Sequence, residues 1–240
     1  AQPVPDAMLD VLRRNVHQYA ILPPELREEL HGHINVFLGE KNLFGCAGLE
    51  ITNEIRYTIA GYACLLLLNR EPSYFPGFTS ILVYPDTYQS MEVVYDGDVE
   101  VHEHSVRAGE SWERGPVVLS WGDVLRGADE VDDGFNVVLH EFAHKLDEEN
   151  SGTDGLPVLR DAGQYEEWSR VFADEYHAFG ERVEMQENDV IDEYGLESPA
   201  EFFAVATESF FEKAGKMKSE LPALYSQLRN FYGVDPASWA

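Results

Sequence analysis

Basic residues are scarce in this sequence of 240 residues. The chain has 17 lysines and arginines against 44 aspartates and glutamates, which gives a formal net charge of −27. A field of this sign repels phosphate backbones and anionic lipid headgroups, so we expect neither nucleic acid nor a membrane as a partner. The excess of acidic residues is itself typical of a highly soluble protein, or of one adapted to a cell with a high internal salt concentration.

Cysteine and long apolar runs are scarce too. Only Cys46 and Cys64 are present, and two cysteines in a chain of this length are no disulfide framework, which is typical of a reducing compartment. The longest apolar run covers residues 59–68. A transmembrane helix needs about 20 apolar residues, so this run is too short to span a bilayer. We therefore expect a cytoplasmic protein.

The sequence has no internal repeat, no low-complexity segment and no long linker. Hydrophobic residues make up 44% of the chain and aromatic residues 12%, a composition typical of a globular protein. We predict a single domain, residues 1–240, with approximate lobes of residues 1–130 and 131–240. We expect this domain to be a monomer.

Periodicity and turn residues predict helices and strands in the first lobe and helices in the second. The strands are expected at residues 79–84, 91–95, 99–104 and 117–121. The helices are expected at residues 7–18, 24–40, 53–68, 164–179, 198–213 and 221–232, in addition to one that begins after residue 135. The predicted fold class is α+β.

The most informative stretch is residues 136–147, which contains His140, Glu141 and His144. Residues four apart lie on one face of a helix, so the two imidazoles can bind the same metal ion. Glu141 lies about 100° further round the helix, where a general base for hydrolysis would sit. The opposite face is apolar, with Phe135, Val138, Leu139, Phe142 and Leu146 at helical spacing. The alternative is an amphipathic helix whose histidines face solvent.

The class of metal site depends on the residues just beyond His144. A hydrolytic zinc site takes three protein ligands and an open position for water. In the metzincin class, a glycine and a third histidine stand at fixed spacing after the second histidine. Asp147 and Asn150 occupy those positions here, which excludes that class and leaves the third ligand to a more distant segment.

The expected helix 198–213 offers the best candidate, Glu201, with Glu208 and Asp192 as its rivals. Carboxylates line one face of this helix, and such a face gains from a nearby cation. Glu201 also has a purely structural alternative, because Ser198 and Glu201 match the spacing of a helix-capping box. Spacing alone leaves both interpretations open.

Many segments, in this order along the chain, resemble the Mlc titration factor A (MtfA) family of zinc peptidases, which is related to the catalytic domain of anthrax lethal factor. The matching segments are residues 26–45, 48–52, 63–68, 81–85, 115–121, 136–147 and 198–212. The resemblance implies a zincin-like fold of the gluzincin type, with a small sheet in the first lobe and a metal site on helices in the second. It also implies that Glu201 is the third zinc ligand.

The resemblance implies roles for two further segments. Tyr194 stands seven residues before Glu201, where lethal factor has a tyrosine that stabilises the transition state. The alternative for Tyr194 is a half-buried loop aromatic. Residues 115–121 would form the edge strand that holds an extended peptide.

The expected function is that of a zinc-dependent peptidase, in which a metal-activated water attacks the peptide bond and Glu141 is the general base. The resemblance suggests aminopeptidase-like cleavage of short peptides. It also suggests an alternative, a regulatory protein that sequesters an Mlc-like transcriptional repressor and whose peptidase activity is secondary. A pseudo-enzyme with structural zinc is a third possibility, which the retained Glu141 weakens.

Three weaker signals surround this site. Asp147 lies on the histidine side of its helix, and its carboxylate would accept a hydrogen bond from a ligand imidazole or from a nearby backbone group. Glu208, if it is not a ligand, would support the metal ligands. His102 and His104 share one face of an expected strand, which suggests either a second metal site or, more simply, a solvated strand face.

Overall fold

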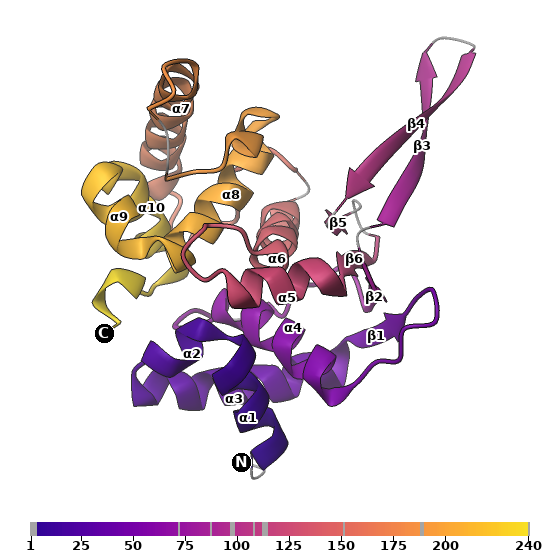
Figure 1. The fold of residues 1–240 in the computed structure, drawn as a ribbon. Coiled ribbons are helices and arrows are strands. Elements are labelled where there is room, and N and C mark those ends of the chain that lie inside the picture. The colour runs from indigo at the N-terminus through magenta and orange to yellow at the C-terminus, as the bar shows by residue number, and fades with distance from the viewer. Residues whose placement is uncertain are drawn as a thin grey trace.

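The computed structural model describes residues 4–71, 73–86, 88–96, 99–107, 109–111, 115–150, 152–187 and 190–239, and between residues 88 and 111 it describes the backbone only. Figure 1 shows the N-terminal helices at the bottom, the strands on the right and the C-terminal helices at the upper left. The fold is mixed and dominated by helices, with one small, mainly parallel sheet. This confirms the mixed class predicted from the sequence.

The first lobe contains α1 (Asp6–Asn15), α2 (His17–Ile21), α3 (Pro24–Glu40) and α4 (Asn53–Leu65). The predicted helix 7–18 is divided at Val16, whose backbone is extended. Pro24 begins α3, where its missing N–H costs no hydrogen bond. The Thr52 hydroxyl accepts a hydrogen bond from the backbone N–H of Ile55 and so caps α4.

Three parallel strands form the sheet: β1 (Asn42–Gly45), β2 (Ser80–Tyr84) and β6 (Val117–Ser120). A short antiparallel strand, β5 (Gly109–Ser111), pairs with β6 and completes the order β1-β2-β6-β5. Because β6 has a partner on each side, the prediction that residues 115–121 form an edge strand is wrong. The edge strand next to it is β5. β6 is buried along its whole length, as expected of an inner strand.

β3 (Tyr88–Asp96) and β4 (Val99–Arg107) form a separate antiparallel hairpin that projects away from the sheet (Figure 1). The predicted strands 91–95 and 99–104 lie within it. The side chains of His102 and His104, for which a second metal site was considered, lie outside the part of the chain whose side chains are described.

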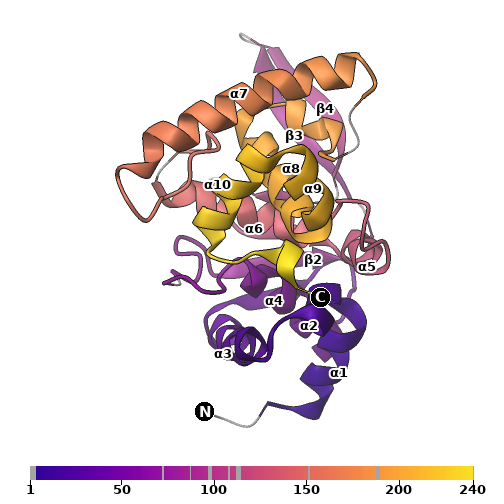
Figure 2. The same cartoon turned by 90° about the vertical axis from the view of Figure 1, so that its left-hand side faces the viewer.

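The second lobe is helical, as predicted, and Figure 2 shows α7 lying across α8 and α10. The 3₁₀ turns are η1 (Glu148–Asn150), η2 (Glu193–Leu196) and η3 (Pro236–Ser238). The first lobe ends with α5 (Trp121–Asp129). The helices of the second lobe are α6 (Val137–Asp147), α7 (Gln164–Glu184), α8 (Pro199–Glu212), α9 (Ala214–Glu220) and α10 (Pro222–Tyr232). Among the described residues, no helix has both the length and the apolar character needed to cross a bilayer.

One hydrophobic core contains residues of both lobes. Phe142, on the apolar side of α6, packs against three aromatic rings of the first lobe. Its ring centroid lies 5.6 Å from that of Phe37, 4.8 Å from that of Phe75 and 6.0 Å from that of Phe78. This packing buries the back of α6 and leaves its histidine face turned towards α8.

Candidate metal centre

α6 presents its two histidines as the motif predicts. Asn136 caps the helix, because its side-chain oxygen accepts a hydrogen bond of 3.1 Å from the backbone N–H of Leu139. His140 and His144 then lie one turn apart, with their Nε2 atoms separated by 3.1 Å and their ring centroids by 4.8 Å. Both imidazoles are therefore directed at the same point.

α8 brings a carboxylate to that point. The Ser198 hydroxyl accepts a hydrogen bond of 3.2 Å from the backbone N–H of Glu201, so the cap predicted at the start of this helix is present. The Glu201 side chain nevertheless faces the histidines. Its Oε2 lies 3.0 Å from Nε2 of His140 and 3.3 Å from Nε2 of His144. The cap holds the backbone of Glu201 and leaves its carboxylate available to the cluster.

The three donor atoms fit a tetrahedral metal ion. They lie 3.0–3.3 Å from one another. Ligands of a zinc ion with bonds of about 2.0–2.1 Å would be about 3.3 Å apart. Oε2 of Glu201 is buried and makes no well-aligned hydrogen bond with a described residue, although both imidazoles are close. The donor atoms of His140, His144 and Glu201 thus converge on one point, where they could hold a metal ion.

The electrostatics of the cluster favour a positive charge. Burial alone lowers the pKa of His140, but Glu201 and Glu208 outweigh that effect and raise the pKa well above its usual value. Burial alone raises the pKa of Glu201, and the two imidazoles outweigh it, so this pKa is lowered. The carboxylates that stabilise an imidazolium here would also stabilise a divalent cation.

Glu141 lies next to His140 in the chain and is buried, with 4% of its surface exposed. Burial raises the pKa of its carboxyl to about 8. Its Oε2 has no hydrogen-bond partner within the described part of the chain. A carboxyl group with a pKa near neutrality and a free oxygen is suited to accept and release a proton.

Glu208 contacts the other side of the His140 ring. Its Oε1 lies 2.8 Å from Nδ1 of His140, so it faces the nitrogen directed away from the cluster. Asp192, the second rival for the role of third ligand, instead accepts a hydrogen bond from the backbone N–H of Tyr194. The structure therefore brings Glu201, and neither rival, to the Nε2 atoms of the two histidines. A carboxylate in the position of Glu208 fixes the orientation and tautomer of the ring.

Tyr194 lies beside the cluster, on η2. Its ring centroid is 6.0 Å from that of His140, and 54% of its surface is exposed. Tyr194 is thus next to the cluster and open to a molecule that approaches it. This position agrees with the expected role of Tyr194, which stays a prediction.

Asp147 holds a loop rather than an imidazole. Its Oδ2 accepts a hydrogen bond of 2.8 Å from the backbone N–H of Gly155. The carbonyl oxygen of Gly155 in turn accepts a hydrogen bond of 3.0 Å from Nε1 of Trp168. Gly155 has φ +75°, and a Cβ there would lie 2.5 Å from the carbonyl oxygen of Pro199, the first residue of α8. The importance of Gly155 does not follow from the sequence, in which the Asp154–Gly155 dipeptide indicates only a turn.

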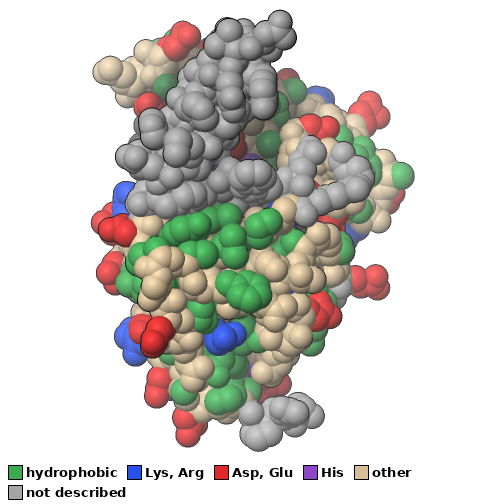
Figure 3. All heavy atoms as spheres, turned by 90° about the vertical axis from the view of Figure 1, so that its right-hand side faces the viewer, with side chains coloured by type: hydrophobic (Ala, Val, Ile, Leu, Met, Phe, Trp, Pro, Cys, Tyr) green, Lys and Arg blue, Asp and Glu red, His purple; other side chains and the backbone are tan. Residues whose placement is uncertain are grey.

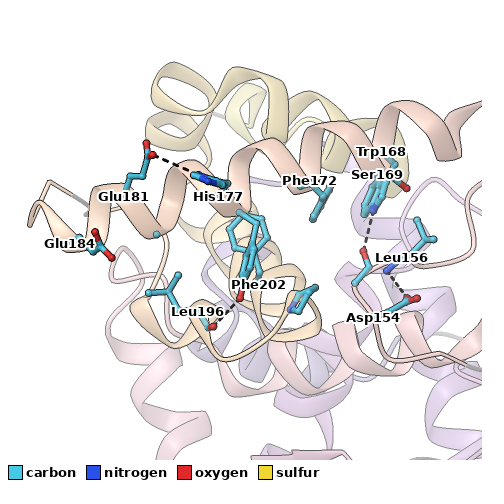
Figure 4. Close-up of a pocket in the computed structure, with 15 residues that line it drawn as sticks. Asp154, Leu156, Trp168, Ser169, Phe172, His177, Glu181, Glu184, Leu196 and Phe202 are labelled. Atoms are coloured by element: carbon cyan, nitrogen blue, oxygen red, sulfur yellow. Dashed lines mark hydrogen bonds and ion pairs between the residues drawn. The ribbon is translucent and has the colours of Figure 1, made fainter.

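The larger of the two described cavities is not lined by His140, His144 or Glu201. It has a volume of about 820 Å³ and lies between α7 and the segment from η2 to α8. Figure 4 shows Trp168, Phe172 and Phe202 among the side chains that line it. Gly155 and Pro199 also belong to its wall, so this cavity lies behind the segment that carries Glu201.

The comparison with known families supports the chemistry that this geometry suggests. A family described as "Glucose-regulated metallo-peptidase M90" matches residues 1–233. The chain belongs to this M90 family. Membership in a metallopeptidase family implies a metal, most simply zinc, and a peptide substrate.

Individual relatives agree with this assignment. A protein of Synechocystis sp., slr2042, is 39% identical over 237 residues, which cover 98% of this chain and 86% of that protein. Mlc titration factor A of Yersinia pestis is 32% identical over 231 residues, 92% of this chain and 83% of the relative. The Yersinia pseudotuberculosis protein of the same name shows the same identity and coverage. The resemblance to the MtfA family found in the sequence is confirmed.

Replacing Gly155 by alanine should destabilise the protein. The positive φ of Gly155 and the approach of a Cβ to 2.5 Å from Pro199 both oppose the substitution. We expect the free energy of unfolding to fall by at least about 1 kcal/mol, measured by urea denaturation. Gly152→Ala is the matched control in the same loop, since a Cβ there would be no closer than 3.3 Å to a side-chain atom. Equal midpoints for the two variants would contradict this account.

Metal analysis of Glu201→Ala and Glu208→Ala separates a ligand from a supporting residue. Glu201→Ala should lose zinc at stoichiometric concentrations, because a donor atom is removed. Glu208→Ala should bind zinc about 10- to 100-fold more weakly, because only the orientation of His140 is affected. Competition with a chromophoric chelator measures both affinities. Loss of zinc from the Glu208 variant alone would show that the third ligand is wrongly assigned.

Proposed function

We propose that this protein is a zinc-dependent peptidase that hydrolyses peptide bonds, with His140, His144 and Glu201 as the zinc ligands and Glu141 as the general base. The observation that carries the proposal is the convergence of three donor atoms, 3.0–3.3 Å from one another, beside the buried carboxyl group of Glu141, whose Oε2 has no hydrogen-bond partner among the described residues. Membership in a metallopeptidase family supports the same reaction class.

Different residues of the chain have different roles in hydrolysis. A zinc ion bound by the cluster would supply a Lewis acid that lowers the pKa of a water and polarises a carbonyl. Glu141 takes a proton from the attacking water and passes it to the leaving amine. A carboxylate whose pKa is raised to about 8 is a stronger base than an ordinary glutamate, which favours the first of these two transfers. Glu208 keeps Nδ1 of His140 engaged, so that Nε2 stays directed at the cluster.

Tyr194 is proposed as the second catalytic residue. Its ring centroid lies 6.0 Å from that of His140 and the residue is more than half exposed, so Tyr194 can contact a substrate that approaches the cluster. We propose that this hydroxyl donates a hydrogen bond to the oxyanion that develops on the attacked carbonyl.

The fold, the oligomeric state, the substrates and the location of the protein are further parts of the proposed function. We assign the chain a zincin-like fold of the gluzincin type, formed by residues 1–240 as one monomeric domain. The shared hydrophobic core of the two lobes supports a single domain. We propose short peptides as substrates, with aminopeptidase-like cleavage, and a cytoplasmic location. The free thiols of Cys46 and Cys64 are compatible with a reducing compartment.

A second candidate function is the binding of an Mlc-like repressor. The name of the Yersinia relatives, Mlc titration factor A, suggests it. Figure 3 shows apolar side chains gathered on the face of the molecule that carries the sheet, and Phe44 of β1 is 50% exposed. Exposed apolar patches are typical of protein contact sites, so this face is where such a partner would bind.

Glu141→Gln tests the assigned base. The glutamine retains the shape of the side chain but cannot accept a proton, so kcat/KM for peptide p-nitroanilides should fall by about 10²- to 10⁴-fold. Zinc content should remain at the wild-type level, and its measurement is the control. Unchanged turnover would remove Glu141 from the mechanism.

Tyr194→Phe tests the oxyanion role. The variant keeps the ring beside His140 and loses only the hydroxyl. We expect kcat to fall by about 10²-fold with little change in KM, as when one oxyanion donor is removed. Zinc affinity should not change, because Tyr194 is not a ligand in this assignment. Full activity with bound zinc would show that Tyr194 has no catalytic role and is an aromatic residue of the loop only.

A further inference from the structure

Asn136 and Glu212, which lie outside the metal cluster, connect the same two helices that carry its donor atoms. The side-chain Nδ2 of Asn136 donates a hydrogen bond of 3.0 Å to Oε1 of Glu212. The backbone N–H of Asn136 donates to Oε2 of Glu208. Oε1 of Glu208 lies 2.8 Å from Nδ1 of His140, so a continuous chain of contacts leads from Glu212 to a cluster histidine.

These contacts belong to a regular pattern. On α6 and its cap, the polar residues are spaced four apart, which places Asn136, His140 and His144 on one helix face. On α8, the spacings are seven and four residues, which places Glu201, Glu208 and Glu212 on one face as well. The two faces meet in opposite chain directions, so that Glu212 faces Asn136, Glu208 faces His140, and Glu201 faces His140 and His144. We call these six residues the polar ladder.

Burial makes the alignment of the polar ladder specific. Asn136 is 2% exposed, Glu208 is 3% exposed and Glu212 is 9% exposed. A buried polar group without a hydrogen-bond partner is unfavourable, because it loses the hydrogen bonds that water makes with it in the unfolded chain. A shift of α8 by one turn along α6 would separate Asn136 from Glu212 and would move Glu201 away from its position between the two histidines. The Asn136–Glu212 contact therefore selects one register of the two helices.

We propose that Asn136 and Glu212 are positioning residues of the metal centre, which hold Glu208 against His140 and set the register at which Glu201 meets the two histidines. This inference rests on the proposed metal binding. The competing account is that the pair only stabilises the packing of the helices. The two accounts differ in whether the loss of the pair changes metal affinity and coordination beyond what a general loss of stability would do.

Two substitutions of Glu212 and one control test this difference. Glu212→Leu removes the acceptor, whereas Glu212→Gln keeps an Oε1 that accepts the same hydrogen bond. Burial raises the pKa of Glu212 well above its usual value, so an uncharged amide is a close substitute. The control is Thr207→Val on α8, because the Thr207 hydroxyl is buried and bonded to the Tyr232 hydroxyl, 2.8 Å away, outside the polar ladder.

We expect zinc affinity, measured by chelator competition, to fall by about 10- to 100-fold in Glu212→Leu and to stay near the wild-type value in Glu212→Gln. The visible absorption spectrum of the Co²⁺-loaded protein should change in Glu212→Leu only. Thr207→Val should lose stability in urea while its zinc affinity and Co²⁺ spectrum remain those of the wild type.

Asn136→Ser gives a second test that does not depend on the folding of Glu212→Leu. Serine retains a capping oxygen for α6 but is too short to reach Glu212. We expect the same loss of affinity, and no further loss when it is combined with Glu212→Leu. If the wild type binds zinc and these variants bind it as tightly as Thr207→Val does, the positioning role is wrong. If the wild type itself binds neither zinc nor Co²⁺, the proposed function fails instead.

Discussion

The packing of α6 against α8 is the constraint on which the rest of the molecule depends. Each helix is apolar on its back and polar on its front, and both backs are buried in aromatic clusters. Phe142 of α6 packs among rings of the first lobe, while Phe203 of α8 lies with its ring centroid 5.9 Å from that of Trp168. Neither helix can rotate without exposing its back, so the polar fronts must face each other. The candidate metal centre lies where they meet.

This arrangement places several carboxyl groups in the interior. Burial raises the pKa of Glu141, Glu208 and Glu212, which means that their ionised forms are unfavourable in the folded protein. Hydrogen bonds from Asn136 and His140 compensate part of this cost. A cation at the cluster would compensate more of it, because it attracts every nearby carboxylate. Metal binding at this cluster would therefore be coupled to folding stability.

Sequence patterns predict structure within one or two helical turns, and they fail where two distant segments meet. The cap at Ser198 and the shared face of His140 and His144 are local, and the structure has them. Glu201 and Glu208 are seven residues apart and share one face of α8, so only the position of α6 shows which of them meets Nε2 and which meets Nδ1. The inner position of β6 likewise depends on β2 and β5, which its own residues do not reveal.

Both ends of α8 are held by α6. At the end of α8, Glu212 is bonded to Asn136, the cap of α6. At its start, Pro199 packs against Gly155, which Asp147 at the end of α6 holds through a backbone hydrogen bond. Because the helices run in opposite directions, the first residue of one is next to the last residue of the other. Two fixed ends leave α8 no freedom to slide, so the carboxylate between them stays within bonding distance of the two histidines. The geometry of the candidate metal centre is therefore a property of the helix pair, and not of residues 140–144 alone.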